Sequence, residues 1–243
     1  GFDLFQGYYL AYPMVIHGKR LQTSKLALLR LLGLLSQDAE TSEVENVLKQ
    51  EPMLTVNLLR LTNSVGSGLA TKITSLRHAI TLLGRRQLLR WLQLLLYSGA
   101  ADAPQAVNPL LQLAATRGRL MELLVDKTPE VIEIGRDLVD QGYMVGILSL
   151  MPALVGCPMS EVICQLPVAQ PVLDALKDRR GTLGDLLSLV EFLENAHDGA
   201  FDKEQSAKVE NILSRLPGID AKYANSCLSR ALAWANNLAR ANI

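Results

Sequence analysis

Residues 24–96 carry leucine and other apolar residues at three- and four-residue intervals, and this spacing is the feature that most restricts the fold. An α-helix turns once every 3.6 residues, so apolar residues at these intervals line one face of a helix. The stretch is therefore expected to form amphipathic helices that pack against one another. The residues that carry the pattern are Leu26, Leu29, Leu32, Leu35, Leu54, Leu58, Leu61, Ile80, Leu83 and Leu94.

The composition agrees with a helical bundle and gives no sign of a membrane segment. Hydrophobic residues make up 49% of the chain and aromatic residues only 5%, which favours packed helices over a β-sandwich. No uninterrupted apolar run reaches the ~18 residues of a membrane span, and none resembles a signal peptide. The three cysteines lack the spacing of a CxxC metal site, so we expect reduced thiols in a cytoplasmic protein: Cys157, Cys164 and Cys227.

Capping residues, prolines and glycines predict where the N-terminal helices begin and end. Ser42 and Glu45 have the spacing of a capping box for a helix that ends near residue 50. Pro52 suits the first position of the next helix, where a missing N–H is tolerated. Gly84 is expected to be a break between two helices or a point of close packing.

The C-terminal part is predicted to continue as helices. One helix is expected from Thr128-Pro129 to residue 141, ended by Gly142 as its C-terminal cap. Residues 143–155 are almost wholly apolar, which predicts a central buried helix bent at Pro152. Asp220 is expected to cap the last helix. Further helices are predicted over residues 183–196, 203–216 and 221–241.

Several of these positions stand in the order and spacing of a known motif. It combines an acidic or Gln residue, Asp or Glu, Pro, any residue and Leu with a later Asn-Ser and a Ser/Ala-Ile…Leu-Gly segment. With this motif the chain resembles an HDOD domain, a bacterial signalling relative of the HD phosphohydrolases, and the similarity continues more loosely to about residue 184. The resemblance implies a compact all-α bundle over residues 21–243. The matching segments are Gln50-Glu51-Pro52-Met53-Leu54, Asn63-Ser64 and Ala79-Ile80-Thr81-Leu82-Leu83-Gly84, and the motif positions expected to be structural are Pro52, Asn63, Ser64 and Gly84.

The first residues carry a second, shorter resemblance. Residues 8–12 form a β-prone run that Pro13 closes. Gln6-Gly7-Tyr8 followed by Pro13 is similar to the closing motif of an EAL domain, the barrel that hydrolyses cyclic di-GMP. A lone terminal strand cannot form a barrel or a two-metal site. Residues 1–20 are therefore predicted to be the remnant of an EAL domain plus a linker, in the C-terminal part of a larger protein.

The sequence predicts no catalytic or metal-binding residues and no cofactor. HD enzymes bind metal through a His-Asp dyad, and related HDOD domains often carry His-Asp inside the central apolar helix. At the matching positions this chain has Ser149 and Leu150. A leucine cannot bind a metal, and a hydroxyl is a poor ligand beside imidazole. A literal His197-Asp198 lies near the end of a predicted helix, where the histidine more simply faces the negative helix C-terminus. The alternative is a metal-dependent HD-type phosphohydrolase.

The charges are unevenly distributed along a chain with no net charge. Residues 1–100 hold 11 Lys and Arg against 6 Asp and Glu, whereas the remainder holds 13 against 18. Such a basic segment can bind an anionic partner, pair with the acidic half of the chain, or simply form a solvated face. A further alternative is a nucleotide or nucleic-acid-binding regulator. The candidate anion- or partner-binding residues are Arg77, Arg85, Arg86 and Arg90.

The function that the resemblance implies is non-catalytic signal transduction. The chain is expected to bind other signalling proteins in a cyclic di-GMP-linked bacterial pathway, and to pass on the state of a neighbouring domain. No membrane partner is expected. Nucleic acid is not an expected partner either, since aromatic side chains that could stack on bases are scarce.

Overall fold

The computed structural model describes residues 23–65, 73, 75–97, 109–163, 168–195 and 203–240, and every regular element in these ranges is a helix. The predicted all-α fold class is confirmed for them. They divide into two compact units, and the chain passes from one to the other between Leu96 and Tyr97. We name the described residues up to Leu96 the N-terminal unit, and those in 97–163 and 169–240 the C-terminal unit. Both fall within the predicted range 21–243, whereas the predicted EAL-like strand lies outside the described residues.

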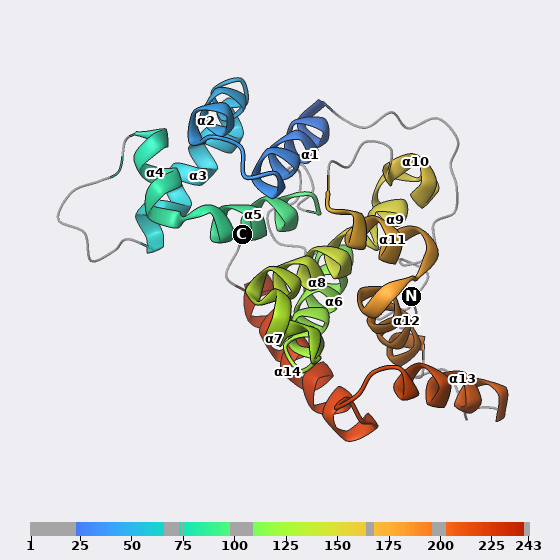
Figure 1. The fold of residues 1–243 in the computed structure, drawn as a ribbon. Helices are drawn as coiled ribbons and strands as arrows, with labels where there is room; N and C mark the ends of the chain where they lie inside the picture. Colours follow the sequence, from blue (N-terminus) through green and yellow to red (C-terminus); the bar gives the residue numbers. More distant parts are fainter. Residues whose placement is uncertain are drawn as a thin grey trace, which may run out of the picture. The chain divides into compact units, whose positions relative to one another are not determined.

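The N-terminal unit consists of packed helices, and these helices are formed by the part of the chain that carries the leucine pattern (Figure 1). The first helix lies against the second and fifth, and the third and fourth lie against each other. Their inward faces bury most of the leucines that the periodicity pointed to, including Leu32, Leu35, Leu54 and Leu58, whereas Leu26 is 45% exposed. The helices are α1 (Thr23–Ser36), α2 (Thr41–Lys49), α3 (Pro52–Val65), α4 (Leu76–Leu83) and α5 (Arg85–Leu95).

The predicted capping box at Ser42 and Glu45 is wrong. Helix α2 begins at Thr41, and the carboxylate of Glu43 accepts the backbone N–H of Glu40 at 3.1 Å. The capping box thus lies two residues earlier, at Glu40 and Glu43. Acidic residues at this end of a helix are also stabilised by the helix dipole. Glu45 is left for ion pairs with Lys49 and Arg77, at 2.8 and 3.3 Å.

Two predictions about turn residues in this unit are confirmed. Pro52 is the first residue of α3, and Gly84 separates α4 from α5 with φ +76°. Nothing lies within 4 Å of the position that a Cβ atom would take at Gly84. Of the two expected roles, the structure therefore supports the break and not close packing, because only the backbone angle requires glycine here.

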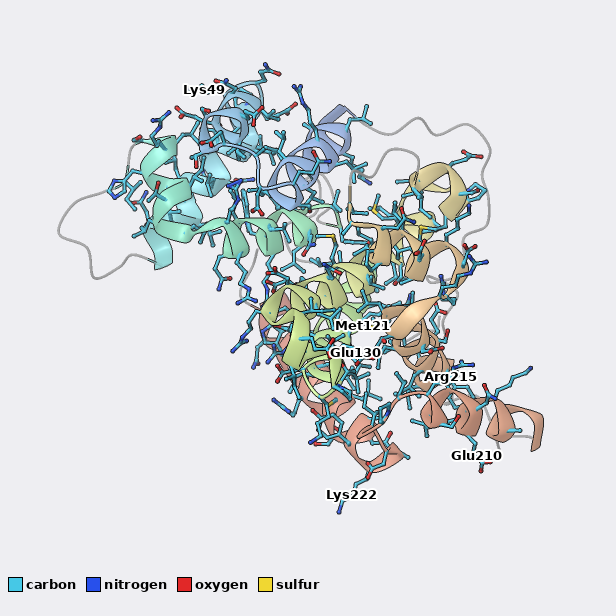
Figure 2. All side chains as sticks on the ribbon, in the orientation of Figure 1. Lys49, Met121, Glu130, Glu210, Arg215 and Lys222 are labelled. Carbon is cyan, nitrogen blue, oxygen red and sulfur yellow. The ribbon has the colours of Figure 1, made fainter. Side chains whose placement is uncertain are left out.

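The C-terminal unit is built around the pair α6 and α8, and α12 and α14 each lie against α6 (Figure 1). Figure 2 shows Met121 among these helices, whereas Lys222 and Glu210 extend outward. The predicted cap of the last helix is confirmed, because Asp220 accepts the N–H of Tyr223 at 2.6 Å. The helices are α6 (Pro109–Val125), α7 (Glu130–Ile134), α8 (Arg136–Leu148), α9 (Met151–Val155), α10 (Met159–Ile163), α11 (Gln170–Asp178), α12 (Gly181–Asn195), α13 (Lys203–Ser214) and α14 (Ala221–Arg240).

The predicted helix end at Gly142 is wrong, and its correction explains how α6 and α8 pack. The chain breaks earlier, at Gly135 with φ +76°, and Gly142 lies inside α8. A Cβ at Gly142 would lie 2.5 Å from Val125 Cγ2, and one at Gly146 would lie 2.6 Å from the carbonyl oxygen of Arg117. These glycines permit close approach of the two helix backbones, so they mark helix packing and not a helix end.

The predicted single helix over residues 143–155 is two helices. Helix α8 ends at Leu148 and α9 begins at Met151, because Pro152 has no N–H to donate back into a continuous helix. Among the described residues, one segment is long and apolar enough to cross a membrane by length and composition, Arg136–Val155, which includes charged residues at its start. Of this segment 72% is buried inside the protein, so its apolar side chains serve the core.

Candidate functional site

A charged side chain lies in the core of the C-terminal unit, where apolar residues are the rule. The side chain of Arg117 on α6 is 6% exposed, and that of Glu194 on α12 is 8% exposed. Arg117 Nε donates to Glu194 Oε1 at 3.0 Å, and Nη2 donates to Glu194 Oε2. This bidentate pair satisfies both charges away from water, which an unpaired buried charge could not do.

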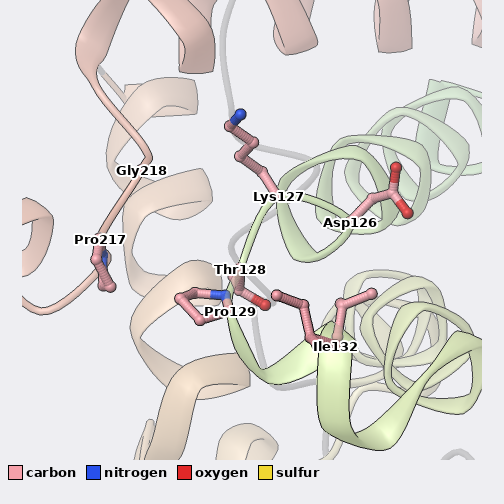
Figure 3. A pocket seen from close by; sticks show the side chains of 8 residues that line it. Asp126, Lys127, Thr128, Pro129, Ile132, Pro217 and Gly218 are labelled. Carbon is pink, nitrogen blue, oxygen red and sulfur yellow. The ribbon is translucent and has the colours of Figure 1, made fainter.

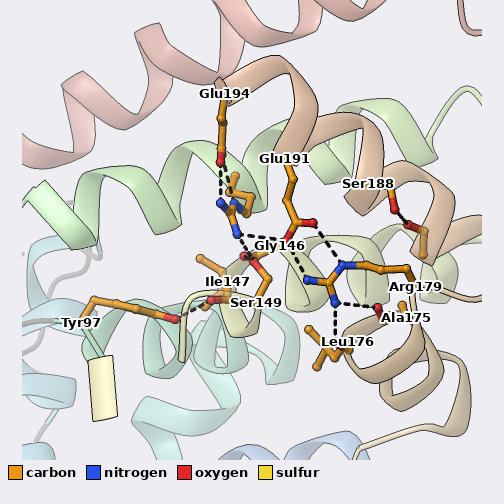
Figure 4. Close-up of polar contacts among 12 residues, drawn as sticks. Tyr97, Gly146, Ile147, Ser149, Ala175, Leu176, Arg179, Ser188, Glu191 and Glu194 are labelled. Carbon is orange, nitrogen blue, oxygen red and sulfur yellow. Dashed lines mark hydrogen bonds and ion pairs between the residues drawn. The ribbon is translucent and has the colours of Figure 1, made fainter. Parts of the chain in front are cut away.

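The remaining nitrogen of Arg117 binds Ser149, the residue predicted to stand where HD enzymes have the dyad histidine. Its Nη1 donates to Ser149 Oγ at 2.8 Å, and the Ser149 hydroxyl donates to the carbonyl oxygen of Gly146 at 2.7 Å (Figure 4). Burial opposes the charge of Arg117, but the attraction of Glu194 and Glu191 is stronger in sum and raises the pKa of the guanidinium. Arg117 is therefore a permanent cation beside Ser149.

A second arginine extends the network toward the surface. Glu191 lies one turn before Glu194 on α12, and its carboxylate is 3.8 Å from Arg117 Nη1. The same carboxylate accepts from Arg179 Nε and Nη2 at 3.1 and 2.8 Å, and Arg179 also donates to carbonyl oxygens at the end of α11 (Figure 4). We name Arg117, Ser149, Arg179, Glu191 and Glu194 the buried network. It links α6, α8, α11 and α12 within one unit.

Leu150, predicted to stand where HD enzymes have the dyad aspartate, is 2% exposed and belongs to the apolar core. Nearby, the hydroxyl of Tyr97 donates to the carbonyl oxygen of Ile147, and burial raises the pKa of Tyr97 well above its ordinary value. The groups around Ser149 are thus the guanidinium of Arg117, the phenol of Tyr97, apolar side chains and, across Arg117, the carboxylates of Glu191 and Glu194. Of these, the carboxylates are the type of ligand that a divalent metal prefers, and both are paired with arginine.

The buried network was not predicted from the sequence, although the sequence holds a signal for part of it. Arg117 lies on the same helical stripe as Leu113, Leu120 and Leu124, at spacings of four, three and seven residues. Glu194 follows Leu187 and Val190 in the same way. A single charge inside an apolar stripe predicts a buried ion pair. The stripe does not tell which opposite charge is the partner, because the two helices are 77 residues apart at the paired positions.

The motif residue Asn63 has a structural role in the N-terminal unit. Its side-chain amide donates to the carbonyl oxygens of Leu59 and Ile73, at 2.7 and 3.0 Å, and its side-chain oxygen accepts the N–H of Ile73 at 2.9 Å. An asparagine side chain can thus pair with both backbone groups of one residue, as a strand would. These hydrogen bonds of Asn63 hold the end of α3 against the buried Ile73. The Ser64 side chain lies outside the described part of the structure.

The four candidate arginines of the basic segment do not act as one group. Arg77 pairs with Glu45 on α2 at 3.3 Å. Arg85 donates to the carbonyl oxygen of Ala39 and lies 3.5 Å from Asp38. Arg86 is exposed and Arg90 is half-buried, and both also have interactions. Two of the four residues therefore hold helices of their own unit together.

Potential metal ligands are scattered among the described residues. In that part of the chain, no three His, Cys, Asp or Glu side chains gather where they could hold a metal ion. His78 is exposed on α4. His197-Asp198 lies outside the described residues, so its predicted place at a helix end stays a prediction.

A surface pocket of about 510 Å³ lies where the turn after α6 faces the loop before α14 (Figure 3). Lys127 forms one side of it, with its ammonium group 5.9 Å from the centre of the Tyr223 ring. The rest is mostly apolar. The lining residues are Asp126, Lys127, Thr128, Pro129, Val131, Ile132, Pro217 and Gly218.

The HDOD domain family matches residues 23–157, which is more than half of the chain. The chain belongs to the HDOD family. The match begins at α1 and extends past Ser149 and Leu150, so the comparison of these two positions with the HD dyad lies inside the family region. The predicted EAL-like segment lies outside the match.

Two curated proteins are similar to this HDOD protein. An uncharacterised protein, YuxH, of Bacillus subtilis (strain 168) is 28% identical over 240 residues, which are 98% of this chain and 54% of YuxH. The cyclic di-GMP phosphodiesterase CdgJ of Vibrio cholerae serotype O1 is 28% identical over 197 residues, which are 81% of this chain and 44% of CdgJ. The chain thus spans about half the length of the curated relatives it matches. No solved structure matches it.

Proposed function

We propose that this HDOD protein is a non-catalytic signalling module that acts in the bacterial cytoplasm by binding other signalling proteins. The observation that carries the proposal is the hydrogen bond from Arg117 to Ser149. A buried cation stands beside the position at which an HD enzyme would hold the first dyad ligand. A divalent metal at this position would be repelled by Arg117 and would find no ligand in Leu150.

The proposed pathway is linked to cyclic di-GMP. Similarity to CdgJ supports this link, since that protein is named for cyclic di-GMP hydrolysis. The EAL-like motif in residues 1–13 supports it independently, because the EAL barrel acts on the same nucleotide. We propose that residues 1–20 are the end of such a barrel, and that the HDOD region relays the state of the barrel to partner proteins.

Metal analysis and hydrolysis assays test the non-catalytic proposal. The purified chain, loaded with manganese or magnesium and then desalted, should retain no stoichiometric ion and should not hydrolyse cyclic di-GMP. Ser149→Ala is the matched variant, because it removes the only dyad-position atom that could touch a metal. About one bound ion per chain, lost in Ser149→Ala together with phosphodiesterase turnover, would establish the HD-type enzyme instead.

Nucleic-acid binding is separated from protein binding by a gel shift. We expect no shifted DNA or RNA at micromolar protein in about 150 mM salt, because phosphate contacts weaken steeply with salt and the chain has no net charge. Protein partners should instead be recovered with the full-length protein, and recovery should survive nuclease treatment. A shift abolished by Arg86→Ala with Arg90→Ala would favour a nucleic-acid regulator over the proposed module.

A further inference from the structure

Helix α7 of the C-terminal unit has three apolar residues, Val131, Ile132 and Ile134, yet it buries no residue. Ile132 is 89% exposed and Ile134 is 52% exposed. The helix ends at Gly135, and at its first residue the hydroxyl of Thr182 donates a hydrogen bond of 2.9 Å to the Glu130 carboxylate. Together with the adjoining pocket of about 510 Å³, these side chains form what we name the α7 surface. Exposed apolar side chains beside a pocket are typical of a contact with another protein.

Helix α3 of the N-terminal unit has an unexpected apolar stripe on its outer face. Met53 is 71% exposed and Val56 is 42% exposed, and Arg60 is exposed on the same helix. Their spacing of three and four residues places all three on one side of the helix. This α3 stripe is separate from the inward-facing Leu54 and Leu58, which are buried.

The two surfaces are complementary in charge. Helix α3 contains one basic residue, Arg60, and no acidic residue, whereas α7 contains two acidic residues, Glu130 and Glu133, and no basic one. The charges that flank α7 cancel, since Asp126 is followed by Lys127 and Arg136 by Asp137. The same opposition holds at larger scale, because residues 1–100 are net basic and the rest of the chain is net acidic.

We propose that the α7 surface docks the α3 stripe of a second copy of this chain. Met53 enters the pocket beside Ile132, and Arg60 lies next to Glu133. Methionine suits such a pocket, because its unbranched side chain adapts to irregular apolar walls. Each copy carries both surfaces, so the contact is head-to-tail, and two copies either close it reciprocally or continue it into a chain. This self-association goes beyond the proposed function and does not depend on it.

Sedimentation velocity over a concentration series tests the proposal with the intact chain. Wild type should change from monomer to a larger species as concentration rises. Met53→Glu and Ile132→Glu should each weaken this association at least about tenfold, because each places a carboxylate in the apolar contact. Leu232→Glu is the matched control, since Leu232 is a 43% exposed leucine on α14 and outside both surfaces. It should associate like wild type.

Mixing the variants shows whether the contact joins these two surfaces. Met53→Glu retains its α7 surface and Ile132→Glu retains its α3 stripe, so an equimolar mixture should associate more tightly than either variant alone, because only the mixture can form an intact contact. Arg60→Glu should likewise weaken association, and adding Glu133→Arg to the same chain should restore it. Wild type that stays monomeric at every concentration overturns the proposal. So does association that the two Glu variants leave unchanged, or a mixture that fails to associate.

Discussion

The strongest test of the buried network is to remove Arg117 and keep its size. Arg117→Met should destabilise the C-terminal unit by about 3–5 kcal/mol, the range found when one partner of a buried ion pair is removed. The loss is high in this range because Glu194, with 8% of its side chain exposed, would keep no cation, whereas Glu191 keeps Arg179. Glu194→Gln should cost less, about 1–3 kcal/mol, because Arg117 retains Glu191 and Ser149.

A double variant separates the ion pair from the packing around it. Replacing both partners, with Arg117→Met and Glu194→Leu, removes the buried charges and leaves apolar groups of similar volume. Such replacements are often neutral or stabilising, so the double variant should lie within about 1 kcal/mol of wild type. The two single effects are then far from additive, as expected for residues in direct contact.

Urea unfolding followed by tryptophan fluorescence measures these differences in one unit. The chain has two tryptophans. A Trp91→Phe background leaves Trp234 of α14, whose ring lies edge-on to Tyr143 at 6.5 Å, as a reporter of the C-terminal unit. Arg180→Met is the control, because Arg180 is 76% exposed and its ion pair with Asp178 is long, at 3.8 Å. It should change stability by less than about 0.5 kcal/mol. An Arg117→Met effect below about 1 kcal/mol, or a double variant as unstable as the single one, would refute the reasoning.

Three further predictions concern single contacts. Asn63→Ala should cost about 1–3 kcal/mol, because it leaves both backbone groups of the buried Ile73 unpaired, whereas Asn46→Ala on the exposed side of α2 should be near neutral. Urea unfolding in a Trp234→Phe background measures both, since Trp91 of α5 then reports on the N-terminal unit. Gly146→Ala should cost at least about 1–3 kcal/mol, since its Cβ would lie 2.6 Å from a backbone oxygen that cannot rotate away; an unchanged midpoint would contradict the close helix packing. Wild type should lose about 1 kcal/mol near pH 10.5 through Tyr97 alone, because burial raises the pKa of Tyr97 in the folded state and only the unfolded state ionises there. Tyr97→Phe, compared at pH 8 and pH 10.5, should lack this part of the loss.

The sequence predicted the helices well where amphipathic spacing and capping chemistry agree. Pro52, Gly84 and Asp220 each have a side chain or backbone preference that acts within a few residues, so their roles could be inferred without knowing the fold. The prediction that Gly142 ends a helix was wrong for the opposite reason. Glycine ends helices and also lets two helices touch, and the second role depends on Val125 of another helix.

For the candidate site, the sequence predicted only that the His-Asp dyad of HD enzymes is replaced. Ser149 and Leu150 could be predicted to occupy the positions of the HD dyad, since the comparison is local to one segment of the sequence. The groups that surround Ser149 come from three other helices and could not be assigned in advance. Of these, Arg117 and Glu194 carried a partial signal in their apolar stripes, whereas Arg179 sits among other charged residues and carried none.

The buried network crosses the C-terminal end of the family match, so the folded unit extends beyond the family region. The HDOD match ends at residue 157 and includes Arg117 and Ser149, but Glu191 and Glu194 lie beyond it on α12. Arg117 is nearly inaccessible to water and needs a counter-charge in the folded state. The carboxylates that supply it come from a helix outside the family match, and α12 packs directly on α6. Residues after 157 are therefore part of the structure that allows a buried arginine beside Ser149. In this chain Ser149, Arg117 and the helix that follows the family region form one physical unit.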